Sequence, residues 1–292
     1  MLADTPFAAL VGAPPAGVDL EPELLERVDC GSYVREKISY LVAAGERVPA
    51  YLCVPKNLTG PAPAVFCHHQ HAHRFDLGKS EVTGLAGDPD QAYARELAER
   101  GFVTIAPDAI GFEERNWSPD GASNVTWFEL STRLVQGRTL LAACLHEVSV
   151  ALDYLTSRPE VDAGRIGFIG HSYGGRTALW APAFDHRIRA SVSNCGCIPF
   201  RLSYTHDTGV QAEFVVPGFA AEYDLEDVIG AFGDTALLIS ATTGDKWSRG
   251  AEELYAAVRG KVPVDLALYE GGHVFTAEMR ERAYTFLADA LH

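Results

Sequence analysis

Positive charge is scarce in this sequence. Among 292 residues, Lys and Arg together number 24 against 39 Asp and Glu, which gives a formal net charge of −15 at pH 7. A surface of this sign repels the phosphate backbone of nucleic acids and the anionic surface of membranes at long range. We therefore expect neither a nucleic-acid partner nor a membrane partner. A chain of this length can bury the core of one large α/β domain.

Long apolar runs are also missing. No stretch is long and apolar enough to cross a bilayer, and the segment MLADTPFAAL has an acidic residue and a proline where a signal peptide needs a basic region and an apolar run. We expect a soluble, cytoplasmic protein. The six cysteines lie mostly within apolar runs, which is typical of free buried thiols, so a disulfide framework is not expected.

Strand-like and helix-like segments alternate along most of the chain. Two β-rich runs on either side of Gly45 are consistent with an antiparallel hairpin. The alternation that follows predicts the α/β class, with a mostly parallel sheet that carries helices on both faces. The expected strands are residues 34–43, 48–55, 62–69, 102–108, 165–170, 188–194, 235–241 and 264–270. The expected helices are residues 87–101, 141–155, 249–260 and 276–291, with another that begins at Tyr173.

Three segments interrupt this alternation, near residues 70–87, 111–130 and 198–234. We interpret them as loop insertions in one α/β domain of residues 31–292, which an N-terminal arm of residues 1–30 precedes. Because each insertion follows a strand, all three should gather at the carboxyl edge of the sheet. Open α/β sheets bind their ligands at this edge.

The segment IGFIGHSYGGRTALW, residues 166–180, permits two interpretations. From Gly170 to Thr177 it reads G-x-x-x-x-G-R-T, one Lys-to-Arg change away from a phosphate-binding loop. Such a loop should end the first strand of its unit and contain a lysine, whereas this segment lies in mid-chain with Arg176 at that place. It also reads G-x-S-x-G, which would raise Ser172 as a nucleophile on a sharp strand-to-helix turn. The glycines around the serine favour the second interpretation.

A serine nucleophile needs a base and a group that orients the base. In this type of sheet the acid and then the histidine follow the serine along the chain. Asp245 directly follows one apolar strand and His273 directly follows the next, so both belong to the edge that presents Ser172. Asp245 alone could be a helix cap, and His273 alone a loop histidine. Their order after Ser172 predicts a Ser-His-Asp catalytic triad.

At these residues the sequence resembles the α/β-hydrolase superfamily. Within it the chain looks like the dienelactone hydrolase and acetyl esterase group, which is related to prolyl-oligopeptidase catalytic domains. The resemblance covers roughly residues 33–292 and is carried by GHSYGG, TTGDKW, EGGHVF and VPAYLCVPKNLTGPAPAVFCHH. It implies the α/β-hydrolase fold, with strand-end loop insertions. Dienelactone hydrolases proper use a cysteine nucleophile, and Ser172 at that position favours ordinary ester substrates.

A histidine-rich turn, HHQHAHRFD, follows the third expected strand. It contains four imidazoles that would suit zinc, those of His68, His69, His71 and His73. Their spacing lacks the H-x-H-x-D-H pattern of binuclear hydrolases, so we expect no metal and no cofactor. Many relatives have an H-G-G-like turn here. The resemblance implies that the N–H of Gln70 or His71, together with that of Tyr173, forms the oxyanion hole.

The three insertions are rich in aromatic residues, which would enclose a small apolar ligand. The predicted substrate-binding residues are Trp117, Trp127, Phe128 and Phe214. Four cations near these loops would either pair with a substrate carboxylate or be solvated rim charges: Arg74, Lys79, Arg115 and Arg201.

These features predict a serine hydrolase that cleaves a small carboxylic ester or lactone through an acyl-enzyme intermediate. An amidase, a peptidase, a thioesterase or an acyltransferase would use the same triad. A non-catalytic ligand-binding protein on the same scaffold is a further alternative. The expected partner is a small-molecule ester, and a homodimer is left open.

Overall fold

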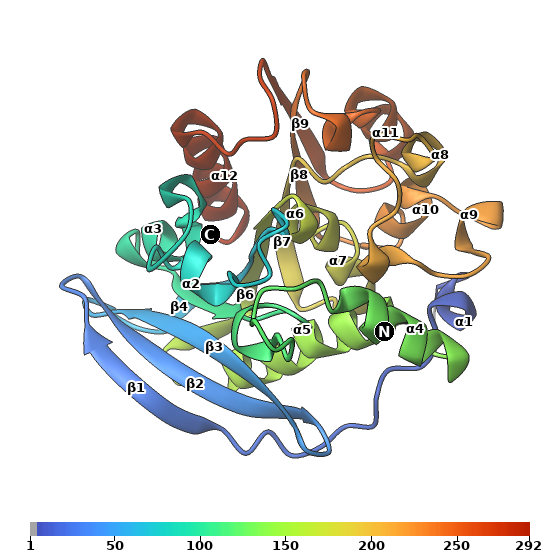
Figure 1. Cartoon of the computed structure of the whole chain (residues 1–292). Helices are drawn as coiled ribbons and strands as arrows, with labels where there is room; N and C mark the ends of the chain where they lie inside the picture. Colours follow the sequence, from blue (N-terminus) through green and yellow to red (C-terminus); the bar gives the residue numbers. More distant parts are fainter. Residues whose placement is uncertain (1–4) are drawn as a thin grey trace.

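A nine-stranded sheet forms the centre of the molecule (Figure 1). The computed structural model describes residues 5–292, so residues 1–4 of the expected N-terminal arm lie outside the described part. The strands are β1 (Glu23–Asp29), β2 (Tyr33–Ala43), β3 (Glu46–Pro55), β4 (Ala62–His68), β5 (Val103–Pro107), β6 (Val161–His171), β7 (Ile188–Asn194), β8 (Ala236–Thr242) and β9 (Val264–Tyr269). They lie in the order β1-β2-β3-β5-β4-β6-β7-β8-β9.

The sheet is parallel through its larger part. Strands β4 to β9 pair parallel with their neighbours, whereas β1, β2 and β3 add an antiparallel extension that joins at β5. The predicted hairpin is confirmed as β2 and β3, and the chain reverses near Gly45, whose φ of 74° suits glycine. The α/β class with a mostly parallel sheet is therefore confirmed.

Strand β1 lies within the segment interpreted as an N-terminal arm, and the sequence analysis does not predict it. It is the edge strand, pairs with β2 alone, and leaves almost all its side chains exposed. It therefore lacks the apolar alternation that marks a half-buried strand. Earlier in the same segment, Phe7 is fully buried against Trp180, with ring centroids 6.3 Å apart. This part of the arm is packed into the fold.

The helices cover both faces of the sheet. They are α1 (Ala8–Val11), α2 (Lys79–Val82), α3 (Tyr93–Glu99), α4 (Thr126–Val135), α5 (Leu140–Ser157), α6 (Tyr173–Thr177), α7 (Ala181–Phe184), α8 (Phe200–Ser203), α9 (Phe219–Glu222), α10 (Leu225–Ile229), α11 (Ala251–Val258) and α12 (Ala277–Ala290). Four 3₁₀ turns join them: η2 (Pro89–Gln91), η3 (Glu113–Arg115), η4 (Ala212–Phe214) and η5 (Lys246–Ser248). Helices α3 and α12 pack on one face, and α5, α10 and α11 pack on the other (Figure 1).

One expected helix is broken. The segment 87–101 forms the turn η2 and then α3, because the backbone of Ala92 leaves helical geometry at ψ 34°. The Asp88 carboxylate accepts a hydrogen bond from the N–H of Asp90, so it caps the 3₁₀ turn rather than a long helix.

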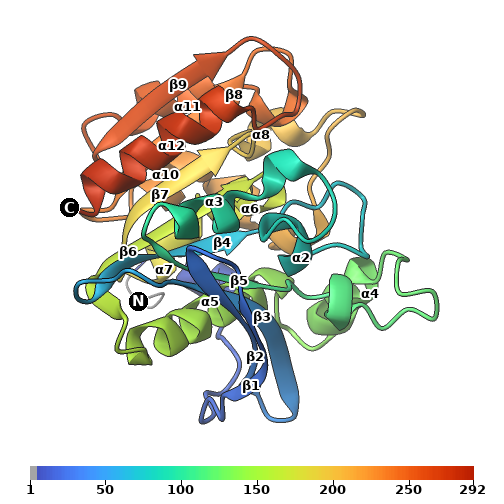
Figure 2. The same cartoon turned by 90° about the vertical axis from the view of Figure 1, so that its left-hand side faces the viewer.

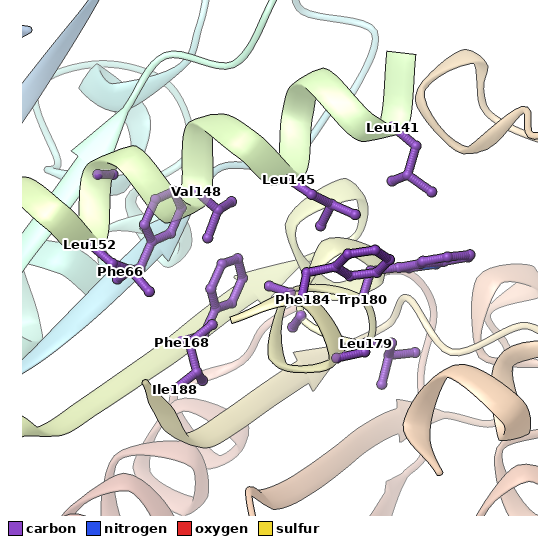
Figure 3. Close-up of a cluster of buried hydrophobic side chains, with 14 of the residues drawn as sticks. Phe66, Leu141, Leu145, Val148, Leu152, Phe168, Leu179, Trp180, Phe184 and Ile188 are labelled. Atoms are coloured by element: carbon purple, nitrogen blue, oxygen red, sulfur yellow. The ribbon is translucent and has the colours of Figure 1, made fainter. Parts of the chain in front are cut away.

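The main core lies between α5 and the sheet. In Figure 3 the apolar side of α5, with Leu145 and Val148, faces the rings that rise from β4 and β6. Phe66 and Phe168 stack there with ring centroids 4.8 Å apart. Trp180 continues the layer towards α7 (Figure 3) and is fully buried. Since the chain enters α6 directly after β6, this packing holds the end of β6 in place.

The three insertions gather over one edge of the sheet. In Figure 2 the helices α2, α4 and α8, one from each insertion, lie on the right-hand side, where the parallel strands end. Within residues 5–292 no single helix is long and apolar enough to span a bilayer. The helices α4 and α5 pass that test only as a pair, bent by 107°.

The core packing predicts a large cost for truncation of Leu145. The side chain is 2% exposed, so Leu145→Ala should leave a cavity and lower the free energy of unfolding by about 2–5 kcal/mol. Urea unfolding measures this change. Val135→Ala on exposed α4, where Val135 is 85% exposed, is the control and should change the same quantity by less than about 0.5 kcal/mol. Equal effects of the two variants would contradict the assignment of the core.

Candidate active site

The segment around Ser172 forms a tight turn between β6 and α6. Ser172 has φ 58° and ψ −112°, a conformation that costs a non-glycine residue free energy. Its N–H donates to the Asn194 carbonyl at 2.8 Å, and its own carbonyl accepts from the Arg176 N–H at 2.8 Å. The turn is thus held from the neighbouring strand and from its own helix.

The glycines of this turn have no room for a side chain. A Cβ at Gly170 would lie 2.3 Å from the carbonyl carbon of Gly174. One at Gly174 would lie 2.1 Å from the His68 oxygen, and one at Gly175 would lie 2.3 Å from the Asn194 oxygen. In each case the obstacle is main chain, which cannot rotate away as a side chain can. The G-x-S-x-G spacing therefore follows from the contact of three backbone segments.

Asp245 and His273 form a hydrogen-bonded pair at the ends of β8 and β9. Their Oδ1 and Nδ1 atoms are 3.1 Å apart. The Ser248 hydroxyl donates to Oδ2 at 2.8 Å and the Trp247 N–H to Oδ1 at 3.1 Å. Burial acts to raise the pKa of Asp245, but the hydrogen bond and charge of His273, with the other two donors, outweigh it and hold this pKa below its ordinary value. The carboxylate is thus kept ionised beside the imidazole.

Two buried side chains connect this pair to the serine turn. The ring of His171, the residue before Ser172, lies 4.5 Å from the ring of His273. Asn194 donates through Nδ2 to His171 Nδ1 at 2.7 Å and to the Val274 carbonyl at 3.1 Å. Burial holds the pKa of His171 well below its ordinary value, so a neutral ring supports His273. Ser172 and His273 therefore belong to one site at the carboxyl edge of the sheet.

Neither connecting residue was identified from the sequence. His171 occupies a variable position of the G-x-S-x-G pattern, so the pattern gives it no role. Asn194 offers a weak signal, because it is a polar side chain at the carboxyl end of a buried strand.

The histidine-rich turn is anchored next to the start of α6. The Tyr93 hydroxyl donates to the His68 carbonyl. His69 bonds through Nδ1 to the Gln70 carbonyl at 2.8 Å, and its Nε2 accepts the Ala109 N–H at 3.1 Å. The Gln70 amide group donates to Glu81 at 3.1 Å. The path of the backbone through this turn is therefore well determined.

Three main-chain amides near this turn remain as donors. Tyr173 begins α6, and the first N–H groups of a helix have no acceptor within it. Within residues 5–292 the N–H groups of Gln70 and His71 have no hydrogen-bond acceptor. These are the three amides that the resemblance implies for the oxyanion hole. Which of Gln70 and His71 would take part stays open.

The four histidines of the turn do not come together as ligands of one metal. Among residues 5–292 the groups with metal-like spacing are Cys195, Asp245 and His273, and Asp108, Glu113 and Glu114. In the second group the Lys79 ammonium pairs with all three carboxylates and occupies the position that a metal ion would take. In the first, burial raises the pKa of the Cys195 thiol to about 12, which disfavours the thiolate that a metal binds.

Two hollows adjoin the site, and Trp247 lines both. A narrow one, without space for a water molecule, is lined by Ser172, Arg176, Cys195, Gly196, Gln211 and Trp247. A larger and more open one is lined by His73, Asp207, Thr243, Gly244, Asp245, Lys246, Trp247, Arg249 and His273. The first lies on the serine side of the site and the second on the histidine side.

The expected substrate-binding aromatics do not line either hollow. Trp117, Trp127 and Phe128 are more than half exposed, and the rings of Trp117 and Phe128 contact each other with centroids 5.0 Å apart. Phe214 is 1% exposed and packs beneath the Arg176 guanidinium, 5.3 Å from its ring centroid. A role of the first three with a larger substrate stays a prediction, and Phe214 supports the site from below.

The four cations considered for a substrate carboxylate already have partners. Each pairs with an acidic side chain of the chain itself: Arg74 with Asp76, Lys79 with Asp108 and Glu113, Arg115 with Glu147, and Arg201 with Asp224 and Glu226. Lys79 is also fully buried, so it cannot act as a rim charge. Arg74 and Arg201 are exposed, as the rim-charge alternative expects, and their pairing with carboxylates of the same loops leaves neither of them free for a substrate carboxylate.

Comparison with known proteins identifies the family. A model of the dienelactone hydrolase family matches residues 78–292. The chain belongs to the dienelactone hydrolase family. Within curated proteins it is 29% identical over 254 residues to "Putative hydrolase YtaP" of Bacillus subtilis (strain 168), which covers 83% of each chain.

Solved structures agree with this family in fold. Acetyl xylan esterase 1 from Thermoanaerobacterium sp. JW/SL YS485 has a TM-score of 0.67 at 17% identity, with 99% of this chain and 100% of that one covered. A glucuronoyl esterase from Solibacter usitatus has a TM-score of 0.69 at 16% identity, with 96% and 88% covered. At this identity the likeness shows the α/β-hydrolase fold.

The buried histidines of this family member should make its stability depend on pH. Burial lowers the pKa of His68 to about 3 and that of His69 to about 4, so both rings are neutral in the folded chain. In the unfolded chain such rings bind protons below about pH 6.5. Each should therefore lower the free energy of unfolding by about 1.4 kcal/mol per pH unit as the pH falls from about 6.5 towards 4.

Urea unfolding at intervals between pH 7 and pH 5 measures this slope. His69→Gln should reduce the slope by about one proton, because one titrating ring is removed. His186→Gln, at an exposed position, should leave it unchanged. A slope that is identical in the wild type and in His69→Gln would contradict the buried neutral state of His69.

Proposed function

We propose that the protein hydrolyses a carboxylic ester through an acyl-enzyme formed on Ser172. The strained backbone of Ser172 carries this proposal most directly, because it presents a hydroxyl at the edge where the Asp245–His273 pair also lies. Solved proteins of the same fold are named esterases, which supports an ester as the substrate class.

The proposed reaction has two halves. His273 accepts the Ser172 proton while Oγ bonds to the carbonyl carbon, and the tetrahedral intermediate breaks its bond to the alkoxide as His273 returns that proton to it. The alcohol leaves and the acyl group stays on Ser172. A water molecule then adds to the acyl carbon and gives its proton to His273. The second tetrahedral intermediate breaks its bond to Oγ as His273 returns this proton to Ser172, which releases the carboxylic acid. Asp245 holds the imidazole in the tautomer that accepts at Nε2.

Main-chain amides supply the electrostatic part of the proposed mechanism. The negative charge that develops on the carbonyl oxygen would lie between the N–H of Tyr173 and that of Gln70 or His71. Donors that are already fixed stabilise this charge more in the transition state than in the ground state. The anchoring of the histidine-rich turn by Tyr93, Ala109 and Glu81 supports such a fixed position.

Removal of the nucleophile should abolish turnover. We expect Ser172→Ala to fold normally and to lose ester hydrolysis by a factor of about a million in kcat, measured with p-nitrophenyl esters of increasing acyl length. A fluorophosphonate probe, followed by mass spectrometry, should label Ser172 in the wild type. Ser157→Ala, at an exposed serine on α5, is the matched control and should keep both activity and labelling. Labelling of another residue would refute the assignment.

Loss of the aspartate charge should disturb the histidine without removing it. Asp245→Asn should lower kcat by about four orders of magnitude if the carboxylate sets the tautomer, as in serine proteases. The rate of phosphonylation of Ser172 should fall in parallel, whereas the urea midpoint should move little. Asp234→Asn, at an exposed position, is the control. An Asp245→Asn enzyme within tenfold of the wild-type rate would remove Asp245 from the mechanism.

A further inference from the structure

His273 lies on a loop that has little side-chain packing of its own. Residues 270–274 are exposed, and Gly271 and Gly272 directly precede the histidine. Glycine has no side chain to pack, and its backbone is freer than that of any other residue. The position of the imidazole therefore depends on the hydrogen bonds that hold this loop to the ends of the neighbouring strands.

The part of the loop before His273 is tied to the aspartate. The Gly272 carbonyl accepts a hydrogen bond from the Thr242 hydroxyl at 2.7 Å. Thr242 is the last residue of β8, and Asp245 follows shortly after it. This bond keeps His273 beside the Asp245 carboxylate, which lies 3.1 Å from Nδ1 of the imidazole.

The part of the loop after His273 is tied to the serine turn through Asn194. Nδ2 of Asn194 donates to the Val274 carbonyl at 3.1 Å and to Nδ1 of His171 at 2.7 Å. The main-chain carbonyl of Asn194 accepts the Ser172 N–H at 2.8 Å. Asn194 is fully buried at the end of β7, so bulk water does not compete for these bonds. One residue thus joins the loop of the histidine to the turn of the serine.

The orientation of the Asn194 amide follows from its partners. A main-chain carbonyl has no proton to donate, so the atom that faces the Val274 oxygen is the amide nitrogen. On the other side, the amide oxygen accepts from the Ser240 hydroxyl at 2.7 Å. The nitrogen therefore also faces His171, whose Nδ1 can accept only if it carries no proton. His171 is thus a neutral ring with its proton on Nε2.

The charge of His171 matters because its ring lies 4.5 Å from that of His273. In the proposed mechanism His273 becomes a cation, and a second positive charge at this distance would oppose that step. The other titratable groups around the two rings are Asp245, Tyr93 and Cys195. Burial raises the pKa of Tyr93 well above its ordinary value and that of the Cys195 thiol to about 12, so both are uncharged. Of these three groups, Asp245 alone is charged at neutral pH.

We propose that Asn194 is a positioning residue of the active site. Its Nδ2 group fixes the His273 loop against the Ser172 turn, and it also keeps His171 uncharged beside the imidazole that accepts the serine proton. Asn194 acts through these two histidines rather than on the substrate itself. This inference rests on the proposed function, since it takes His273 to be the base that serves Ser172.

Loss of the amide donors should slow the reaction without weakening substrate binding. Asn194→Asp keeps the shape of the side chain and an oxygen for Ser240, but it has at most one proton to donate. We expect kcat for a p-nitrophenyl ester to fall about ten- to a hundredfold, because a small displacement of a reacting group has effects of this size. KM should change by less than about threefold, and the rate of fluorophosphonate reaction at Ser172 should fall with kcat.

A second variant and a control complete this test. Asn194→Leu has neither donor nor charge, and it should show the same fall in kcat at a nearly constant KM. Ser193→Ala is the matched control on the same strand, since Ser193 is fully buried and its hydroxyl has no hydrogen-bond partner within residues 5–292. It should keep both constants. An equal loss in Ser193→Ala, or a rise in KM that matches the fall in kcat, would overturn the positioning role.

The state of the His171 ring can be measured without any ester. In wild-type protein with isotopically labelled histidine nitrogens, NMR should show Nδ1 of His171 without a proton and Nε2 with one. The ring should not titrate between about pH 5 and 8, where an ordinary histidine does. His171→Gln identifies the signal, because the signal is lost in that variant. A His171 ring that takes up a second proton in this range, or that carries its proton on Nδ1, would contradict the proposal.

These measurements separate the inference from the proposed function. A wild type that neither hydrolyses an ester nor reacts with the phosphonate would refute the proposed function, and the inference with it. A wild type that does both, with Asn194 variants that are equally active or a His171 ring that titrates, would overturn the inference alone.

Discussion

The site depends on a contact between main chains that leaves space only for hydrogen atoms. The backbone of α6 touches the end of β4 at Gly174 and the end of β7 at Gly175. Gly196 approaches the main-chain nitrogen of Arg176 as closely, since a Cβ at Gly196 would lie 2.3 Å from that nitrogen. The strained conformation of Ser172 costs about 1–3 kcal/mol, and this surrounding packing maintains it. The same contacts set the distance from the serine to both the histidine-rich turn and the narrow hollow.

A second set of contacts ties the insertions to this centre. The N–H and the ammonium of Lys79 both donate to Asp108, at 2.8 and 2.7 Å, and Ser80 donates to Glu113. Burial raises the pKa of Asp108 to about 7, and the fully buried ammonium at 2.7 Å opposes this rise. The first two insertions are therefore joined by a buried ion pair. His69, bonded to the Ala109 N–H, transmits this anchorage to the proposed oxyanion turn.

The elements that could be predicted from the sequence are those with a local pattern of apolar residues. The elements that could not be predicted depend on pairing with distant segments. The strands with apolar runs and the helix 141–155 were predictable because their periodicity is a local property. Strand β1 was not, because an exposed edge strand exists only through its pairing with β2. The glycines around Ser172 predicted the turn for a steric reason that the contacts bear out. The partners of Arg74, Arg115 and Arg201 could not be predicted, because each depends on how separate segments meet.

The net charge of −15 disfavours the binding of a polyanionic macromolecule more than the binding of a small anionic ligand. The field of surface charges is screened over a Debye length of about 8 Å at physiological salt, and it acts on polyanions through many contacts. A single buried guanidinium acts at hydrogen-bond distance, where water is excluded and the effective dielectric constant is low. The buried Arg176 guanidinium is therefore a local positive charge beside Ser172 in a chain that is negative overall. The negative charge of the whole chain and the buried positive charge of Arg176 are compatible, because they act over different distances.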